Sequence, residues 1–153
     1  MSILFSVQVA LGQPLTIPNK AQMTAWFRAA LPPQIKDSEV ALKIVDIEEG
    51  TRLNQQYRGK TGPTNVLSFP YTLPGREVGW LLGDLAICAP LVAEEAAAQG
   101  KSLEAHWAHL VIHGTLHLLG YDHIEEKDAE IMESLEIDIM KRLGFASPYR
   151  EKA

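Results

Sequence analysis

The chain has 153 residues, of which 46% are hydrophobic and 22% are charged, and its formal net charge at pH 7 is -5. This length and composition favour a single globular domain over residues 1–153 and exclude a disordered or collagen-like chain. Cys88 is the only cysteine in the sequence, so an intrachain disulfide and a cysteine-rich zinc finger are both excluded.

The N-terminal part of the sequence bears on where the protein works. The first basic residue is Lys20, and apolar residues alternate over 3–9 as in a strand, so this segment lacks the features of a signal peptide. No segment approaches the roughly 20 uninterrupted apolar residues that a membrane helix needs. We therefore expect a cytoplasmic protein that has no membrane partner.

The first third of the chain alternates between predicted strands and helices. Alternating apolar residues predict strands over 3–9 and 39–47. Helical spacing of apolar residues predicts a helix over 20–31. A short polar helix is predicted over 49–57.

Two more strands are predicted in the middle of the chain. A loop over 58–64, which contains two glycines and a proline, separates them from the preceding helix. Apolar, β-rich residues predict these strands over 65–69 and 80–88, and Pro74 and Gly75 predict the turn between them.

The second half of the chain is predicted to be helical. Pro90 suits the first turn of a helix that ends before Gly100. Ser102 can cap the start of the next helix, which continues to about Leu119 and stops at Gly120.

The last predicted helix begins near Glu125 and has Ile131, Leu135, Ile139 and Leu143 on one face. The order of all these elements predicts an α/β or α+β fold. In this fold a small mixed four-stranded sheet is covered by about five helices.

All five histidines lie between His106 and His123, most of them on one predicted helix. His113 and His117 are one turn apart along this helix and about 40° apart around its axis, and His109 comes one turn earlier on the same side. The rest of the helix is apolar, which predicts that it is buried. Imidazoles in such a place need polar partners, because an unsatisfied buried polar group costs about 1–3 kcal/mol.

A metal ion would supply such a partner. His113 and His117 can present ring nitrogens to one ion, and a turn at Gly120 can bring His123 to the same ion as a third ligand. Three imidazoles with an open fourth position are typical of catalytic zinc, whose bound water ionises near neutral pH. We therefore predict one zinc ion per chain, at the buried histidine helix and the turn after it. Asp122 is a rival third ligand, since two histidines and a carboxylate bind non-heme iron.

The histidine spacing also matches the zinc-peptidase pattern His-Glu-x-x-His-x-x-Gly-x-x-His. Gly114 stands where those enzymes have their general-base glutamate. Without that carboxylate, the attacking water has no proton acceptor for amide cleavage. The pattern thus favours the metal site but not peptidase chemistry.

Charge is distributed unevenly along the chain. Residues 51–76 contain four basic residues and no acidic ones, whereas residues 125–142 contain seven acidic residues and three basic ones. The first segment could therefore meet a polyanion while the rest of the chain repels it. A surface loop and a solvated acidic helix would give the same pattern.

Three motifs resemble those of the YbeY endoribonuclease family, also described as an rRNA maturation factor family. The first is His-Gly-Thr-Leu-His-Leu-Leu-Gly-Tyr-Asp-His at 113–123. The second lies within 53–70 and includes Tyr-Arg-Gly-Lys and Pro-Thr-Asn-Val-Leu-Ser-Phe-Pro. The third is Leu-Gly-Asp-Leu-Ala-Ile at 82–87. The motifs are in the family's order, and the likeness extends over most of the chain.

The resemblance implies a metal-dependent endoribonuclease that cuts single-stranded RNA. Its implied work is rRNA maturation, notably at the 3′ end of the small-subunit rRNA, and ribosome quality control. The ribosome or its small subunit and assembly factors are the implied partners. The resemblance also implies that His113, His117 and His123 are the zinc ligands and that Arg58 is catalytic.

The chemistry of individual residues agrees with this resemblance. Arg58 can bind a phosphate with two donors, and Lys60 can add a point charge beside it. Asp84 could orient a ligand histidine or form a hydrogen bond at a strand end. Thr61 and Asn65 stand where a common form of the family motif is acidic, and we interpret both positions as tuning the loop.

Two other functions remain open. A zinc hydrolase of another class, such as a peptidase, would use the same ligands, and the missing glutamate argues against it. A non-catalytic ribosome-assembly factor would use zinc only structurally and would unfold when a ligand is lost. In a nuclease, either a water on the metal or the ribose 2′-hydroxyl could be the attacking group.

Overall fold

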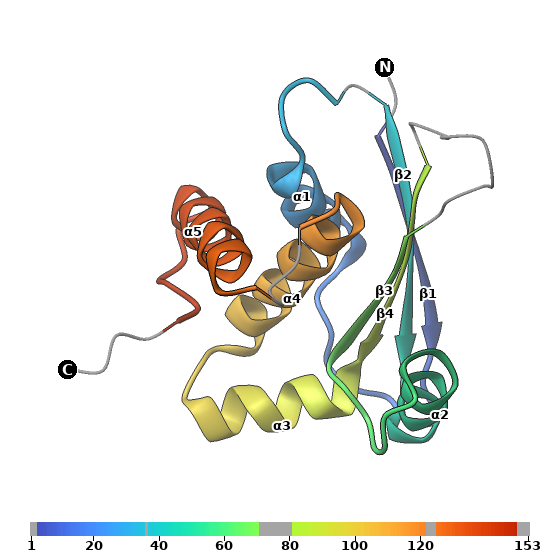
Figure 1. The fold of residues 1–153 in the computed structure, drawn as a ribbon. Helices are drawn as coiled ribbons and strands as arrows, with labels where there is room; N and C mark the ends of the chain where they lie inside the picture. The colour runs from blue at the N-terminus through green and yellow to red at the C-terminus, as the bar shows by residue number, and fades with distance from the viewer. Residues whose placement is uncertain (1–2, 36, 71–80, 122–124, 150–153) are drawn as a thin grey trace.

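Four strands and five helices form the part of the chain that the computed structural model describes, namely residues 3–35, 37–70, 81–121 and 125–149 (Figure 1). In chain order the elements are β1 (Ile3–Ala10), α1 (Lys20–Ala30), β2 (Ser38–Val45), α2 (Ile47–Arg58), β3 (Val66–Pro70), β4 (Leu81–Cys88), α3 (Ala89–Gln99), α4 (Leu103–Leu118) and α5 (Glu126–Arg142). Their number and order confirm the predicted fold class.

The sheet has the strand order β1-β2-β4-β3. β1, β2 and β4 are parallel, and β3 is antiparallel to β4. Parallel neighbours need a crossover connection, which α1 supplies between β1 and β2. The sheet is therefore mixed, as predicted, and β3 forms one of its edges.

Helices lie on both faces of this sheet (Figure 1). α1 and α4 pack on one face, and α5 packs on α4 on the side away from the sheet. α2 lies on the other face, where Gly50 approaches Cys88 at the end of β4. The main core lies between the sheet and α1 and α4, and its large buried side chains include Phe27, Leu42, Ile44, Leu85, Ile87, Trp107, Ile112 and Leu116.

Side-chain caps set where the helices begin. Ser102 caps α4 as predicted, since its hydroxyl accepts a hydrogen bond from the backbone N–H of Ala105 at 3.0 Å. α2 begins at Ile47, earlier than predicted, because Asp46 caps it by accepting from the backbone N–H of Glu49 at 3.0 Å. β2 ends earlier than predicted for the same reason.

The buried face of α5 agrees only in part with the predicted one. Ile131, which the apolar pattern places inside, is 46% exposed. The buried residues are Met132, Glu136, Ile139 and Met140. Ile139 is buried as predicted, and Leu135 and Leu143 pack against the core partly buried, so the prediction was wrong only for Ile131. The buried face is turned toward Glu136, which has hydrogen-bond partners inside the molecule.

The predicted turn at Pro74 and Gly75 lies outside the described residues. The two strands that it would join, β3 and β4, are antiparallel neighbours, as a short connection requires. Among the helices of the described ranges, none has both the length and the apolar character needed to cross a membrane.

Candidate functional site

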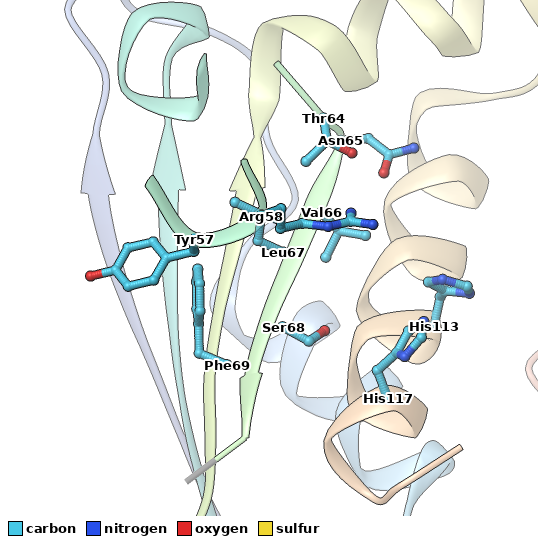
Figure 2. A pocket seen from close by; sticks show the side chains of 10 residues that line it. All are labelled: Tyr57, Arg58, Thr64, Asn65, Val66, Leu67, Ser68, Phe69, His113 and His117. Atoms are coloured by element: carbon cyan, nitrogen blue, oxygen red, sulfur yellow. The ribbon is translucent and has the colours of Figure 1, made fainter. Parts of the chain in front are cut away.

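A cleft of about 420 Å³ lies between the end of α2, the edge strand β3 and α4. Figure 2 shows the side chains that line it, which are Tyr57, Arg58, Thr64, Asn65, Val66, Leu67, Ser68, Phe69, His113 and His117. The basic segment and the histidine helix, far apart in the sequence, therefore meet in one place.

His113 and His117 both line this cleft from α4 (Figure 2). Their ring centroids are 4.8 Å apart, and the rings meet edge to face at 74°. The structure thus brings together the two residues that the helical spacing predicts as ligands of one ion. His123, the predicted third ligand, and its rival Asp122 lie outside the described residues.

Arg58 is the last residue of α2, and its side chain extends over β3 toward the histidine helix (Figure 2). Gly59 ends the helix with a left-handed φ of 64°, which glycine adopts without strain. Asn54, buried in α2, donates a hydrogen bond to the carbonyl of Gly62 at 2.8 Å and so holds the following loop. Lys60, the other predicted substrate-binding residue, is exposed in that loop and lies outside the lining of the cleft.

A buried carboxylate contacts the histidine helix from α5. Glu136 is 0% exposed, and its Oε1 lies 2.8 Å from Nε2 of His109 and 2.8 Å from Nδ1 of His113. The hydroxyl of Tyr149 donates to Oε2 at 2.7 Å. Ligand atoms of His109, His113 and Glu136 all lie within 4.8 Å of one another, so this group could hold a metal ion.

The pKa of Glu136 reflects two opposing effects. Burial raises the pKa, but hydrogen bonds from His109 and His113 outweigh burial and lower the pKa to about 2. Glu136 is therefore ionised at neutral pH, and its carboxylate oxygens act as hydrogen-bond acceptors. Burial and the bond to Glu136 raise the pKa of Tyr149, which keeps its hydroxyl protonated.

Glu136 is the residue at this site that sequence reasoning missed. A signal was present, because Glu136 is spaced four residues from Met132 and from Met140 and so shares their helix face. An acidic residue between two apolar ones at this spacing indicates a buried carboxylate with an internal partner.

His106, two turns before His113, belongs to a different group. Its Nε2 lies 2.8 Å from Oε1 of Glu95 on α3, and Asn65 donates to the same oxygen at 3.1 Å. Burial lowers the pKa of His106, although Glu95 acts in the opposite direction. As expected, buried imidazoles have polar partners, since carboxylates lie against Nε2 of His106 and of His109. Nδ1 of each of these two rings is buried without a hydrogen-bond partner among the described residues.

Gly114 packs closely against the sheet. A Cβ atom at this position would lie 2.8 Å from Cδ2 of Leu85 and 3.3 Å from Cγ2 of Val66. The place where zinc peptidases have their glutamate is therefore filled by β3 and β4. Asp84 is exposed in a groove on the other face of the sheet, so it is not placed to orient a ligand histidine.

Comparisons with known proteins agree with the motifs. A family model described as Endoribonuclease YbeY matches residues 14–144. Endoribonuclease YbeY from Methylococcus capsulatus is 58% identical over 135 residues, which cover 88% of this chain and 89% of that protein. The solution structure of TM1509 from Thermotoga maritima has a similar fold, with a TM-score of 0.53 and 24% identity, over 95% of this chain and 99% of that one. The resemblance is thus confirmed, and this chain belongs to the YbeY endoribonuclease family.

Proposed function

We propose that this chain is a metal-dependent endoribonuclease that cuts single-stranded rRNA, including the 3′ end of the small-subunit rRNA, on the ribosome or its assembling small subunit. The observation that carries the proposal is the cleft in which Arg58 meets His113 and His117, in a member of the YbeY endoribonuclease family. Cleavage of a phosphodiester requires an activated nucleophile and stabilisation of the charge that develops on phosphate oxygens. The cleft has groups suited to both tasks.

We infer that one zinc ion per chain is held by His113, His117 and His123. The rings of His113 and His117 line the same cleft, and their centroids are 4.8 Å apart. Neutral imidazoles are ligands that suit zinc. When bound, zinc in such a site activates a water molecule and polarises a phosphoryl oxygen. The contact between Nδ1 of His113 and Glu136 is compatible with ligation through Nε2 of the same ring.

Arg58 binds the phosphate in this proposal. Its planar, positively charged guanidinium offers paired donors to two phosphate oxygens. The acidic helix α5 packs on the far side of α4 (Figure 1), so it is not placed to neutralise Arg58. Arg58 is therefore available to stabilise the negative charge that develops during cleavage.

Features beside Arg58 favour a single strand as substrate. Tyr57 is 59% exposed and meets Phe69 edge to face, with ring centroids 5.0 Å apart. Exposed rings of this kind can stack on unpaired bases, which a duplex keeps inside its own stack. Residues 57–70, which supply this wall of the cleft, include no acidic residue that would repel phosphate.

The proposal is tested with the purified full-length chain and a labelled single-stranded RNA that ends in the small-subunit rRNA 3′ sequence. We expect cleavage by the zinc-loaded protein, loss of cleavage with a chelator, recovery with added zinc, and no cleavage of the same sequence in a duplex. A 2′,3′-cyclic phosphate on the product would identify the ribose 2′-hydroxyl as the attacking group. Absence of cleavage by the zinc-loaded protein would contradict the proposal.

The variant His117→Ala separates catalytic zinc from structural zinc. We expect this variant to remain folded while it loses zinc and RNA cleavage together. Circular dichroism and metal analysis of one sample measure both properties. Unfolding of the variant would instead favour an assembly factor whose zinc is structural.

A further inference from the structure

Glu136 is a buried carboxylate that contacts a proposed zinc ligand and that none of the three sequence motifs contains. We propose that Glu136 is a positioning residue, which holds the ring of His113 so that Nδ1 carries the proton and Nε2 binds the metal. This inference rests on the metal site of the proposed function. It extends that site to a second helix, α5.

Three side chains, two on α4 and one after α5, fix the Glu136 carboxylate. Oε1 accepts from two histidines of α4, at 2.8 Å from Nε2 of His109 and 2.8 Å from Nδ1 of His113. Oε2 accepts from the hydroxyl of Tyr149, which comes after α5, at 2.7 Å. A fully buried carboxylate is stable only when donors surround it in this way. Glu136 therefore cannot turn without losing a hydrogen bond, and the ring of His113 is held with it.

The hydrogen bond between Glu136 and His113 decides which nitrogen of the His113 ring can bind a metal. A neutral imidazole has one N–H and one lone pair, so donation from Nδ1 leaves the lone pair on Nε2. Carboxylate partners of ligand histidines fix the tautomer and the ring orientation and make the ligand more basic. The ring of His117 lies next along α4, at 4.8 Å between centroids. The orientation of His113 thus controls whether the two rings face one ion.

Direct ligation by Glu136 is the competing arrangement. The group of His109, His113 and Glu136 could itself hold an ion, but His113 would then ligate through Nδ1. The pairing of His113 with His117 in the cleft would have no role in such a site. The two arrangements therefore predict different effects for the same variants.

Three variants of the full-length protein test the role of the carboxylate. Glu136→Met removes the acceptor but keeps a long side chain beside two methionines of α5. Glu136→Gln keeps an oxygen acceptor and removes the charge, and Tyr149→Phe removes only the hydroxyl that holds Oε2. Glu95→Gln is the matched control, because it changes the carboxylate partner of another α4 histidine, His106.

Zinc affinity, measured by competition with a chelating dye, is the first readout. We expect a loss of about 10–100-fold for Glu136→Met, the range found when carboxylate partners of metal ligands are removed. Glu136→Gln and Tyr149→Phe should lose less, and Glu95→Gln should bind zinc as the wild type does. Circular dichroism at the same temperature establishes that each variant is folded.

The second readout is the tautomer of His113 in the metal-free protein, from the ¹⁵N NMR shifts of its ring. We expect the proton on Nδ1 in the wild type and in Glu136→Gln, and a mixture of tautomers in Glu136→Met. A residue that only supports the fold would not produce this difference. If Glu136→Met fails to fold, the wild-type tautomer and the affinity of Glu136→Gln decide the question.

Wild-type zinc affinity in folded Glu136→Met, or a wild-type His113 with its proton on Nε2, would overturn the proposal. If Glu136→Gln lost zinc binding as completely as His117→Ala does, and His109→Asn lost it too, Glu136 would be a zinc ligand. That result would also overturn the proposal. These readouts do not depend on nuclease activity. A wild type that binds zinc but cuts no RNA contradicts the proposed function alone, and one that binds no zinc contradicts both.

Discussion

Arg58 combines a long, exposed side chain with a backbone that its neighbours hold in place. Gly59 ends α2 directly after it, and Asn54 fastens the next loop through the carbonyl of Gly62. The backbone of Arg58 is therefore held in a defined position at the cleft, which would limit the orientations of the phosphate in the proposed function.

Replacement of Arg58 should separate chemistry from metal binding. We expect Arg58→Ala to keep its zinc but to cut single-stranded RNA about 100-fold more slowly, since removal of one donor to a developing oxyanion costs about 10²–10³ in kcat. Arg58→Lys keeps the charge without the paired donors, so its rate should be intermediate. Single-turnover cleavage with protein in excess measures this step.

The control for this loss is Arg28→Ala. Arg28 is exposed on α1, outside the cleft, and its replacement changes the net charge by the same amount. We expect it to cut at the wild-type rate. Full activity in Arg58→Ala would remove Arg58 from the mechanism.

His106 gives the stability of the fold a pH dependence. Burial lowers its pKa from the ordinary 6.5 and Glu95 on α3 opposes this, while Lys101 and His109 lower the pKa further. The unfolded chain therefore takes up a proton at this histidine at a higher pH than the folded protein does. The stability that the folded protein owes to an uncharged His106 is therefore fully present above pH 6.5 and is lost as the pH falls below that value.

We expect the wild-type free energy of unfolding in urea to fall from about pH 7 to about pH 5 by more than that of His106→Gln. Glutamine can still donate to Glu95 but does not titrate, so the difference between the two slopes isolates His106. Equal slopes in the two proteins would refute this assignment.

The cleft owes its width to close approaches between elements. Gly114 lets α4 approach the sheet, and Ser68 of β3 donates to the Gly114 carbonyl at 3.1 Å. Within the sheet, Gly83 of β4 has a φ of 143°, and a Cβ there would lie 2.2 Å from the carbonyl oxygen of Phe69. These two glycines keep β3 and α4 close enough to form one site.

Gly83→Ala should therefore be strongly destabilising. A non-glycine residue in a sparsely populated backbone region costs about 1–3 kcal/mol, and the clash with the Phe69 carbonyl adds to that. Gly144→Ala is the matched control, because its φ is 91° with nothing within 4 Å of the added Cβ, so it should cost only about 1–2 kcal/mol. Urea unfolding measures both, and equal losses would contradict a role for the close approach.

Most elements could be predicted because their signals are local. The cap at Ser102, Gly100 after α3 and the alternation in β1 each act within a few residues. The spacing along α5 indicates that Glu136 shares a face with two methionines, but the side chains that bind Glu136 could not be predicted in this way. These partners are His109 and His113 of α4 and Tyr149, which lie elsewhere in the sequence. The pairing of His113 with His117 could be predicted from their spacing along one helix. The contact of His113 with Glu136 could not, because tertiary packing of α5 on α4 creates it.

Charge is separated across the fold. The net charge is -5, yet Arg58 and Lys60 belong to a segment without acidic residues, while the acidic helix α5 lies beyond α4 (Figure 1). A polyanion is therefore attracted to one side of the protein and repelled by another. In the proposed function, this arrangement would favour approach of RNA from the side of the cleft and weaken its binding elsewhere.

The salt dependence of RNA binding should arise from basic residues on the side of the cleft and not from those on α5. On a single strand, each neutralised phosphate contributes about -0.7 to the slope of log K against log salt concentration. In a cleavage-deficient His117→Ala background, we expect Lys60→Ala to make this slope shallower by about 0.7. Lys127→Ala, an equal change of charge on the exposed start of α5, should leave the slope unchanged.

Fluorescence anisotropy of a labelled single-stranded RNA over a series of salt concentrations gives the slopes. Because Lys60 lies outside the lining of the cleft, this comparison decides its role: equal slopes for Lys60→Ala and Lys127→Ala would mean that the RNA does not extend from Arg58 to Lys60.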